Sequence, residues 1–129
     1  MKIYVIGNPL VPNDRASLIL IPALQSVFPL IDFCVVDPNE NFPPKNERNL
    51  VILDTVQGIR KPMKLRLEDM EVRTKTPVTP HDYDLMMHLL LLQKMRRVDT
   101  VIIVGVPEEM KRSQTEELTR LIADISRST

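Results

Sequence analysis

The first fourteen residues read MKIYVIGNPLVPND, a short apolar run followed by a polar loop. Ile3 to Ile6 are β-branched or aromatic, which predicts a buried strand, and Gly7 comes directly after it. The loop then ends in the carboxylate of Asp14. Because ligands of an open α/β sheet bind beyond the carboxyl ends of its strands, we expect functional residues between Gly7 and Asp14 and at the neighbouring strand ends.

Another buried strand is predicted at Leu50–Leu53 (LVIL), which is apolar on both faces like a central parallel strand, and it ends at Asp54. The first and third strands of a doubly wound sheet are commonly neighbours, so we expect Asp54 close to Asp14. The sequence Thr79-Pro80-His81-Asp82 predicts a helix start, with a threonine cap and a proline in the first turn. We therefore expect the imidazole of His81 near the two carboxylates.

Apolar periodicity and turn residues predict the remaining elements. Helices are expected at Ala16–Phe28, His81–Arg97 and Ser113–Ser126, and further strands at Ile31–Val36, Met63–Leu67 and Thr100–Val104. Asn13 or Asp14 is able to cap the first helix, in which Pro22 marks either a kink or the true first turn. The strand at 63–67 follows its predecessor too closely for a helical crossover, so it is expected to be antiparallel and near an edge. Strand and helix alternate, which predicts a single α/β domain over residues 1–129, with a mostly parallel sheet and helices on both faces.

The composition argues against several classes of protein. The 17 basic and 17 acidic side chains cancel, and aromatic residues make up only 4% with no Trp, so the charge and the stacking surfaces typical of nucleic-acid binding are missing. The longest apolar run, 85–92, is interrupted by His88 and is far shorter than the ~20 residues of a membrane span. A single cysteine allows no internal disulfide, and the first residues lack the features of a secretory signal. We expect a cytoplasmic protein with no nucleic-acid or membrane partner.

Asp14, Asp54 and His81 together form a candidate metal site. Two neighbouring carboxylates repel each other, a divalent cation removes that repulsion, and mixed nitrogen and oxygen ligands suit first-row transition metals. Three protein ligands would leave positions open for substrate or water. The residues alone also allow a structural interpretation, in which Asp54 caps a loop, Asp14 caps a helix and His81 is a solvent-exposed residue of a first turn.

The other notable residues are expected to be structural. His88 lies about 10 Å along the helix from His81, too far for both to bind one ion, and its apolar neighbours indicate a hydrogen-bonded core histidine. Cys34 is expected to be a buried, inert thiol inside a strand. The middle of the helix that begins at His81, LMMHLLLL, is apolar nearly all round, which indicates deep burial or a partner surface. All three glycines are expected just after strands: Gly7, Gly58 and Gly105.

Four motifs in series cover most of the chain. They are Ile6-Gly7-Asn8-Pro9-Leu10 followed by Asp14, Val51-Ile52-Leu53-Asp54 with Gly58 and Pro62 behind it, Thr79-Pro80-His81 before a Leu-rich helix, and Val101 to Glu108. In this order they resemble the nickel-iron hydrogenase maturation endopeptidases. The resemblance implies a three-layer α/β/α fold with a five-stranded mixed sheet, in which the strand at about Met63–Leu67 is antiparallel.

The resemblance also implies an activity. Members of this family are hydrolases that remove the C-terminal extension of a hydrogenase large-subunit precursor after nickel insertion. The resemblance therefore implies an endopeptidase, which we expect to be of the aspartic type. The family's metal ligands correspond to Asp14, Asp54 and His81, which would act in catalysis through the metal. Nickel would come with the precursor, with another divalent metal such as zinc as the alternative. The enzyme is expected to be a monomer or a weak homodimer.

Two other functions remain open from the sequence. The family usually has glycines near the positions of Val5, Arg15-Ala16 and Met63, and also in the loop after the second strand, where this chain has Asp37-Pro38-Asn39-Glu40-Asn41. Such glycine-poor loops favour a non-catalytic accessory protein of the same fold that recognises a metallocentre without cutting it. A third possibility is an α/β interaction domain that self-associates through the apolar helix at 81–97.

Overall fold

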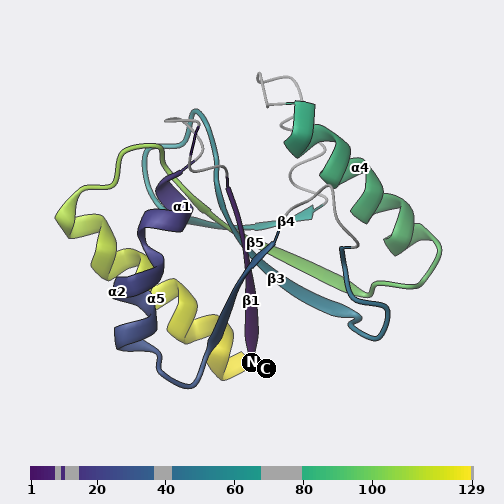
Figure 1. Cartoon of the computed structure of the whole chain (residues 1–129), viewed down its shortest axis with the longest axis horizontal. Helices are drawn as coiled ribbons and strands as arrows, with labels where there is room; N and C mark the ends of the chain where they lie inside the picture. The colour runs from purple at the N-terminus through teal and green to yellow at the C-terminus, as the bar shows by residue number, and fades with distance from the viewer. Residues whose placement is uncertain (8–9, 11–14, 37–41, 68–79, 129) are drawn as a thin grey trace.

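The computed structural model describes residues 1–7, 10, 15–36, 42–67 and 80–128, with the side chains of 80–84 excepted. Its strands form one five-stranded sheet in the order β2-β1-β3-β5-β4 (Figure 1). The strands are β1 (Lys2–Ile6), β2 (Asp32–Val36), β3 (Asn49–Thr55), β4 (Met63–Arg66) and β5 (Thr100–Val106). All neighbouring pairs are parallel except β4 with β5, which are antiparallel. The expected mixed sheet with one antiparallel edge strand is confirmed.

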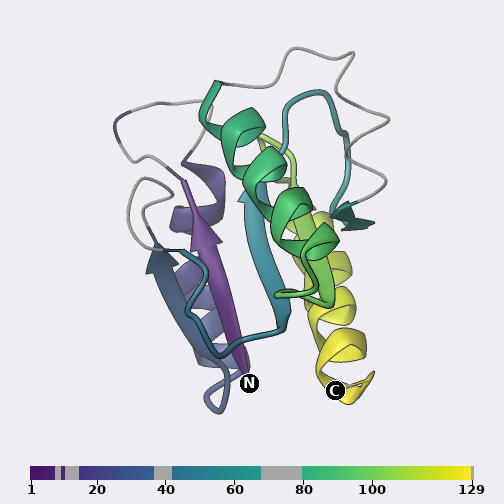
Figure 2. The ribbon, with the colours of Figure 1, turned by 90° about the vertical axis from the view of Figure 1, so that its right-hand side faces the viewer.

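Helices cover both faces of the sheet, as Figures 1 and 2 show. The short α1 (Ala16–Ile19), α2 (Ile21–Val27) and α5 (Arg112–Ser128) lie on one face, and α4 (Pro80–Lys94) lies on the other. Each face has its own apolar cluster. The cluster under α4 includes Tyr4, Ile6, Leu50, Ile52, Leu85 and Leu89, and the opposite cluster includes Val5, Leu24, Leu53, Val104, Leu118 and Ile122. The alternation of β3 between these clusters explains why LVIL is apolar throughout.

The predicted helix at Ala16–Phe28 is two helices, because Leu20 separates α1 from α2. Pro22 lies in the first turn of α2, where its missing N–H breaks no helical hydrogen bond. The predicted cap is wrong. The N-cap position of α1 is Arg15, which makes no side-chain cap hydrogen bond, and both Asn13 and Asp14 lie outside the described residues.

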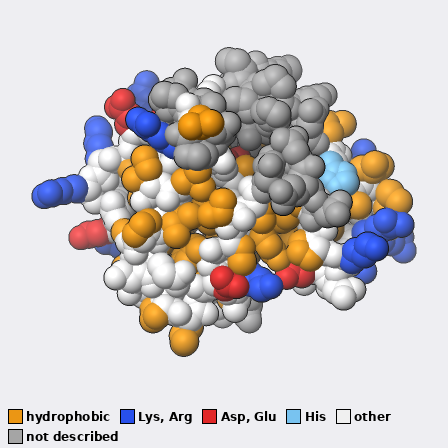
Figure 3. All heavy atoms as spheres, in the orientation of Figure 1, with side chains coloured by type: hydrophobic (Ala, Val, Ile, Leu, Met, Phe, Trp, Pro, Cys, Tyr) orange, Lys and Arg blue, Asp and Glu red, His pale blue; other side chains and the backbone are white. Residues whose placement is uncertain are grey.

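Helix α4 ends earlier than predicted and buries only one of its faces. Arg96 has a φ of 59° and Arg97 donates a backbone hydrogen bond to Leu92, which is the pattern of a left-handed helix termination. His88 is exposed, so the expectation of a core histidine is wrong. Three apolar side chains spaced four residues apart are exposed: Met87 and Leu91 on this helix and Met95 directly after it. Figure 3 shows apolar and basic side chains at the surface on this side of the molecule. No helix of the described residues is long and apolar enough to span a membrane.

Gly105 lies inside β5 and not after it, so the expectation for this glycine is wrong, although Gly58 occupies a turn with a φ of 85°. A Cβ atom on Gly105 would lie 2.9 Å from Cγ2 of Val56 and 3.3 Å from Cδ1 of Ile59. Both residues belong to the connection between β3 and β4. The glycine therefore lets this connection pack closely against β5, in register with Asp54.

Replacing Gly105 by Ala should lower the free energy of unfolding by about 1–2 kcal/mol, because a valine branch cannot move aside in a packed site. Urea unfolding would measure the change. In a Val56→Ala background, which removes the clashing methyl group, the same replacement should cost clearly less. An equal cost in both backgrounds would contradict this explanation.

Candidate active site

The candidate site lies where β1, β3 and β5 end, which we call the carboxyl edge of the sheet. Ile6 of β1 is in register with Asp54 of β3, and Asp54 is in register with Gly105 of β5. The predicted neighbourhood of the first and third strands is therefore confirmed. The segment that contains Asp14 leaves this edge after Ile6 and rejoins the described chain at Arg15.

Asp54 is half-buried at the carboxyl edge, and its carboxylate oxygen Oδ1 is buried. Asp54 points to the same face of β3 as Leu50 and Ile52, whose side chains belong to the cluster under α4, so its carboxylate lies on the α4 face of the sheet. A buried carboxylate oxygen at a strand end is a hard anionic donor of the kind that divalent cations bind.

Helix α4 begins at the same edge. Its 15 residues span about 22 Å, and the seven residues of β3 span about 23 Å, so the helix runs the full length of the strand. Its far end is fixed by Arg48, whose Nη2 donates to the carbonyl of Arg96 at 2.7 Å and to the carboxylate of Asp99 at 2.9 Å. Figure 2 shows the first turn of α4 at the end toward which β1 and β3 point.

The three predicted ligands are described to different degrees. Asp54 is described fully, His81 lies in the first turn of α4 with its side chain outside the description, and Asp14 lies outside it altogether. Among the described side chains, no three His, Cys, Asp or Glu residues are grouped in a way that would hold a metal ion. The assignment of the trio as metal ligands therefore stays a prediction.

Two buried hydroxyl groups lie at the carboxyl edge on the face of β3 opposite to the Asp54 carboxylate, and nothing in the sequence analysis predicts them. We call Ser17 and Thr55 the hydroxyl pair. The backbone N–H of Ser17 donates to Oγ1 of Thr55 at 3.0 Å, and Oγ of Ser17 donates to the carbonyl of Ile6 at 2.6 Å. Oγ1 of Thr55 donates to Oγ of Ser17 at 3.2 Å. Each hydroxyl proton is used once, because the carbonyl of Ile6 can only accept.

The hydroxyl pair replaces the predicted helix cap. Ser17 is the second residue of α1, and Thr55 supplies from β3 the acceptor that a capping side chain would supply from the helix itself. The available signals were weak: a threonine directly after a strand-end aspartate, and a serine in the first turn of a helix with no serine, threonine, asparagine or aspartate at its N-cap.

Cys34 on β2 is half-buried, in place of the full burial expected. Burial raises the pKa of its thiol, and a hydrogen bond with Asp32 raises it further. Both effects keep the thiol protonated near neutral pH, which is consistent with the expected inert cysteine.

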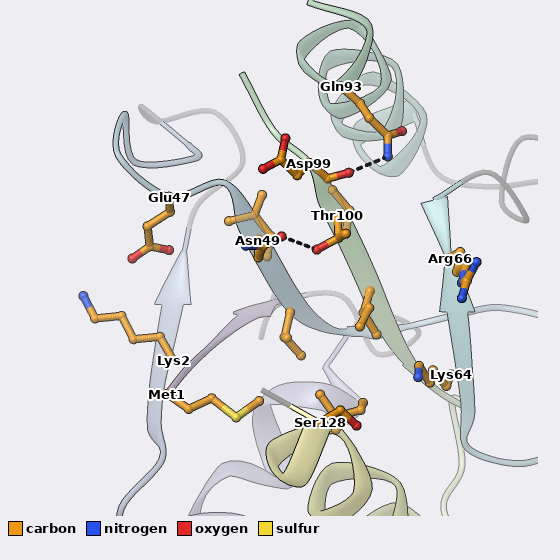
Figure 4. A pocket seen from close by; sticks show the side chains of 15 residues that line it. Met1, Lys2, Glu47, Asn49, Lys64, Arg66, Gln93, Asp99, Thr100 and Ser128 are labelled. Carbon is orange, nitrogen blue, oxygen red and sulfur yellow. Dashed lines mark hydrogen bonds between the residues drawn. The ribbon is translucent and has the colours of Figure 1, made fainter. Parts of the chain in front are cut away.

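A hollow of about 1090 Å³ opens at the opposite, amino edge of the sheet. Figure 4 shows Lys64 and Arg66 of β4 on one side of it and Lys2 and Glu47 on the other. Glu47 accepts a hydrogen bond from the hydroxyl of Tyr4. No residue of the carboxyl edge lines this hollow, so the hollow and Asp54 lie at opposite ends of the sheet. We assign the candidate site to the carboxyl edge, because Asp54 combines a buried oxygen with the topology expected of a site.

Solved structures with the same fold include three hydrogenase-related or peptidase proteins. The hydrogenase maturating endopeptidase HybD from E. coli aligns with a TM-score of 0.69 and 20% identity over 99% of this chain and 93% of its own. The [NiFe] hydrogenase maturation protease HybD from Thermococcus kodakarensis aligns with a TM-score of 0.62 and 15% identity over 97% and 99%. An endopeptidase from Escherichia coli, solved in solution, gives 0.62 and 17% over 97% and 90%.

No protein-family model and no curated protein sequence matches the chain. At identities of 15–20% the structural matches show the fold alone. Because the alignments span nearly the whole of both chains, this chain has the complete α/β/α fold of those proteins, with Asp54 at the end of its third strand.

Replacing Thr55 by Val should lower the free energy of unfolding by about 1–3 kcal/mol, because the buried N–H of Ser17 would lose its acceptor while the side-chain volume stays the same. Replacement by Ser should cost clearly less, since the hydroxyl is kept. Urea unfolding of both variants measures the difference. Equal stabilities of the Val and Ser variants would mean that the hydroxyl group contributes nothing.

Proposed function

We propose that this protein is an endopeptidase that removes the C-terminal extension of a nickel-iron hydrogenase large-subunit precursor after nickel insertion. The observation that carries the proposal is the carboxyl edge itself. There β1 and β3 end in register, Asp54 holds a buried carboxylate oxygen, and α4 begins with His81 in its first turn. The fold that presents this edge is shared with proteins named as hydrogenase maturation proteases and endopeptidases.

Asp14, Asp54 and His81 are proposed to bind the nickel of the precursor. Two carboxylates and an imidazole form a mixed oxygen and nitrogen donor set, which fits nickel and also zinc. The buried oxygen of Asp54 fits this role, because an anion at a partly buried edge is stabilised by a cation that arrives with the substrate. Since three protein ligands do not complete a coordination shell, positions remain open for the precursor's own ligands.

The chain's own contribution to hydrolysis is positioning. The backbone of Asp54 is held by β-sheet pairing on both sides, to β1 and to β5, so the point from which its side chain projects is set before substrate arrives. Binding of the precursor's metallocentre at this edge would bring the peptide bond of the tail beside it. A bound divalent metal supplies Lewis-acid polarisation of a carbonyl or acidification of water. Among the described residues we assign no separate nucleophile, which is consistent with the inert Cys34.

The proposal is tested by incubating the protein with nickel-loaded precursor and weighing the products. The wild-type protein should convert the precursor into one shorter large subunit plus its C-terminal peptide. Asp54→Asn and His81→Ala should lower the rate by about 10- to 100-fold or more, because the first replaces an anionic ligand by a neutral amide oxygen and the second removes the imidazole. Precursor without nickel should stay intact.

The chain offers matched controls for both substitutions. His88 lies on the same helix as His81 but is exposed seven residues further along, so His88→Ala should cut at the wild-type rate. Asp32 is an exposed aspartate at the other end of the sheet, so Asp32→Asn should do the same. An unchanged precursor mass with wild-type protein, or equal rates for the site variants and their controls, would rule the proposal out.

The accessory protein of the same fold is distinguished by the same experiment. It would retain nickel-loaded precursor on the immobilised protein while the mass of the precursor stays unchanged. The glycine-poor segment around Arg15 and Ala16 is the feature that favours it. In the structure, however, Ala16 begins α1 and is buried. The fold therefore accommodates an alanine at this position and does not require a glycine there.

A further inference from the structure

The hydroxyl pair of Ser17 and Thr55 joins the ends of three secondary-structure elements at the carboxyl edge. Ile6 is the last residue of β1, Thr55 is the last residue of β3, and Ser17 is in the first turn of α1. The three hydrogen bonds between them measure 2.6, 3.0 and 3.2 Å. Two of these three residues flank Asp54 directly: Thr55 follows it in sequence, and Ile6 is its partner on β1.

The polarity of this pair is unusual for its surroundings. Ser17 and Thr55 are 0% and 2% exposed, and they are the only buried polar residues among the described side chains. The neighbouring cluster on this face of the sheet is apolar, including Val5, Leu53 and Val106. A valine at position 55 would fill the same space without a buried hydroxyl group. Hydroxyl groups in apolar surroundings are favourable only when they are fully hydrogen-bonded. Their hydrogen bonds then fix the relative orientation of the backbone segments that they join, and not only the distance between them.

The pair also fixes both ends of the segment that contains Asp14. The segment begins after Ile6, whose carbonyl accepts from Ser17, and it ends at Arg15, two residues before Ser17. Thr55 holds Ser17 through two of the three hydrogen bonds. Thr55 and Asp54 are consecutive and lie on opposite faces of β3, so the same short piece of backbone sets the position of the Asp54 carboxylate and of the segment's return.

We propose that Ser17 and Thr55 are positioning residues of the candidate site: they set where Ile6 and the start of α1 lie relative to Asp54. The expected effect of the pair on catalysis rests on the proposed function. Its expected effect on the start of α1 and on Ile6 rests on the hydrogen bonds alone. Neither side chain is proposed to touch substrate or metal. Both act through the backbone that carries Asp54 and through the start of α1.

The first arm of the test is kinetic and uses nickel-loaded precursor with Thr55→Val, Ser17→Ala and Thr55→Ser. The first two variants should lose about 10- to 100-fold in kcat with KM changed less than about threefold, because the ligands are misplaced and not removed. Thr55→Ser should restore kcat to within about threefold of wild type. All rates are measured where each variant is fully folded by circular dichroism.

Thr100 provides the matched control. Its hydroxyl also joins β3 to a neighbouring element, by donating to Oδ1 of Asn49 at 2.6 Å, but it lies at the amino edge. Thr100→Val therefore removes a hydroxyl group that links β3 to its neighbour, far from the candidate site. It should leave kcat unchanged. A wild-type kcat for Thr55→Val, or an equal loss for Thr100→Val, would overturn the proposal.

The second arm is hydrogen exchange followed by mass spectrometry, and it needs no activity. Thr55→Val should speed exchange in peptides that cover residues 6–17 while peptides of β5 and α5 keep their wild-type rates. Exchange that rises equally over the whole sheet, or nowhere, would overturn the positioning role. If wild-type protein leaves the precursor uncut, the proposed function fails, and the exchange pattern still decides whether the hydroxyl pair holds the segment.

Discussion

The parallel pairing of β1 with β3 is the contact on which the rest of the carboxyl edge depends. It places Ile6 opposite Asp54, and it brings the start of the segment before α1 to the strand end that carries the aspartate. The hydroxyl pair then joins α1 to both strands from the opposite face. On the α4 face, a helix as long as the strands reaches the same edge because Arg48 fixes its other end. The strand pairing, the hydrogen bonds of the hydroxyl pair and the length of α4 thus all position residues at the carboxyl edge.

Much of this arrangement could be predicted from the sequence because it depends on patterns of burial. The run LVIL is apolar on both faces and is a central strand, while MKLRL alternates and is the antiparallel edge strand. The position of Asp54 at a strand end follows from the same pattern. These features depend on which side chains avoid water, and each can be recognised within a few residues of chain.

The features that could not be predicted depend on contacts between distant residues. Thr55 lies 38 residues from Ser17, and nothing near Ser17 indicates that its N–H finds an acceptor on strand β3. The apolar neighbours of His88 predict a core position, but the helix turns this side chain toward solvent. Gly105 suggested a turn, whereas its role is to let Val56 approach β5. In each case tertiary packing, and not local sequence, determines the outcome.

Nickel binding at the carboxyl edge through Asp14, Asp54 and His81 is the proposal on which the function depends. It is tested most directly by crystals grown with nickel chloride and an anomalous difference map at the nickel absorption edge. We expect a peak at bonding distance from the carboxylate of Asp54 and the imidazole of His81, with Asp14 as the third ligand. A map with no peak at this edge, or with its nickel bound elsewhere on the protein, would contradict the proposed site.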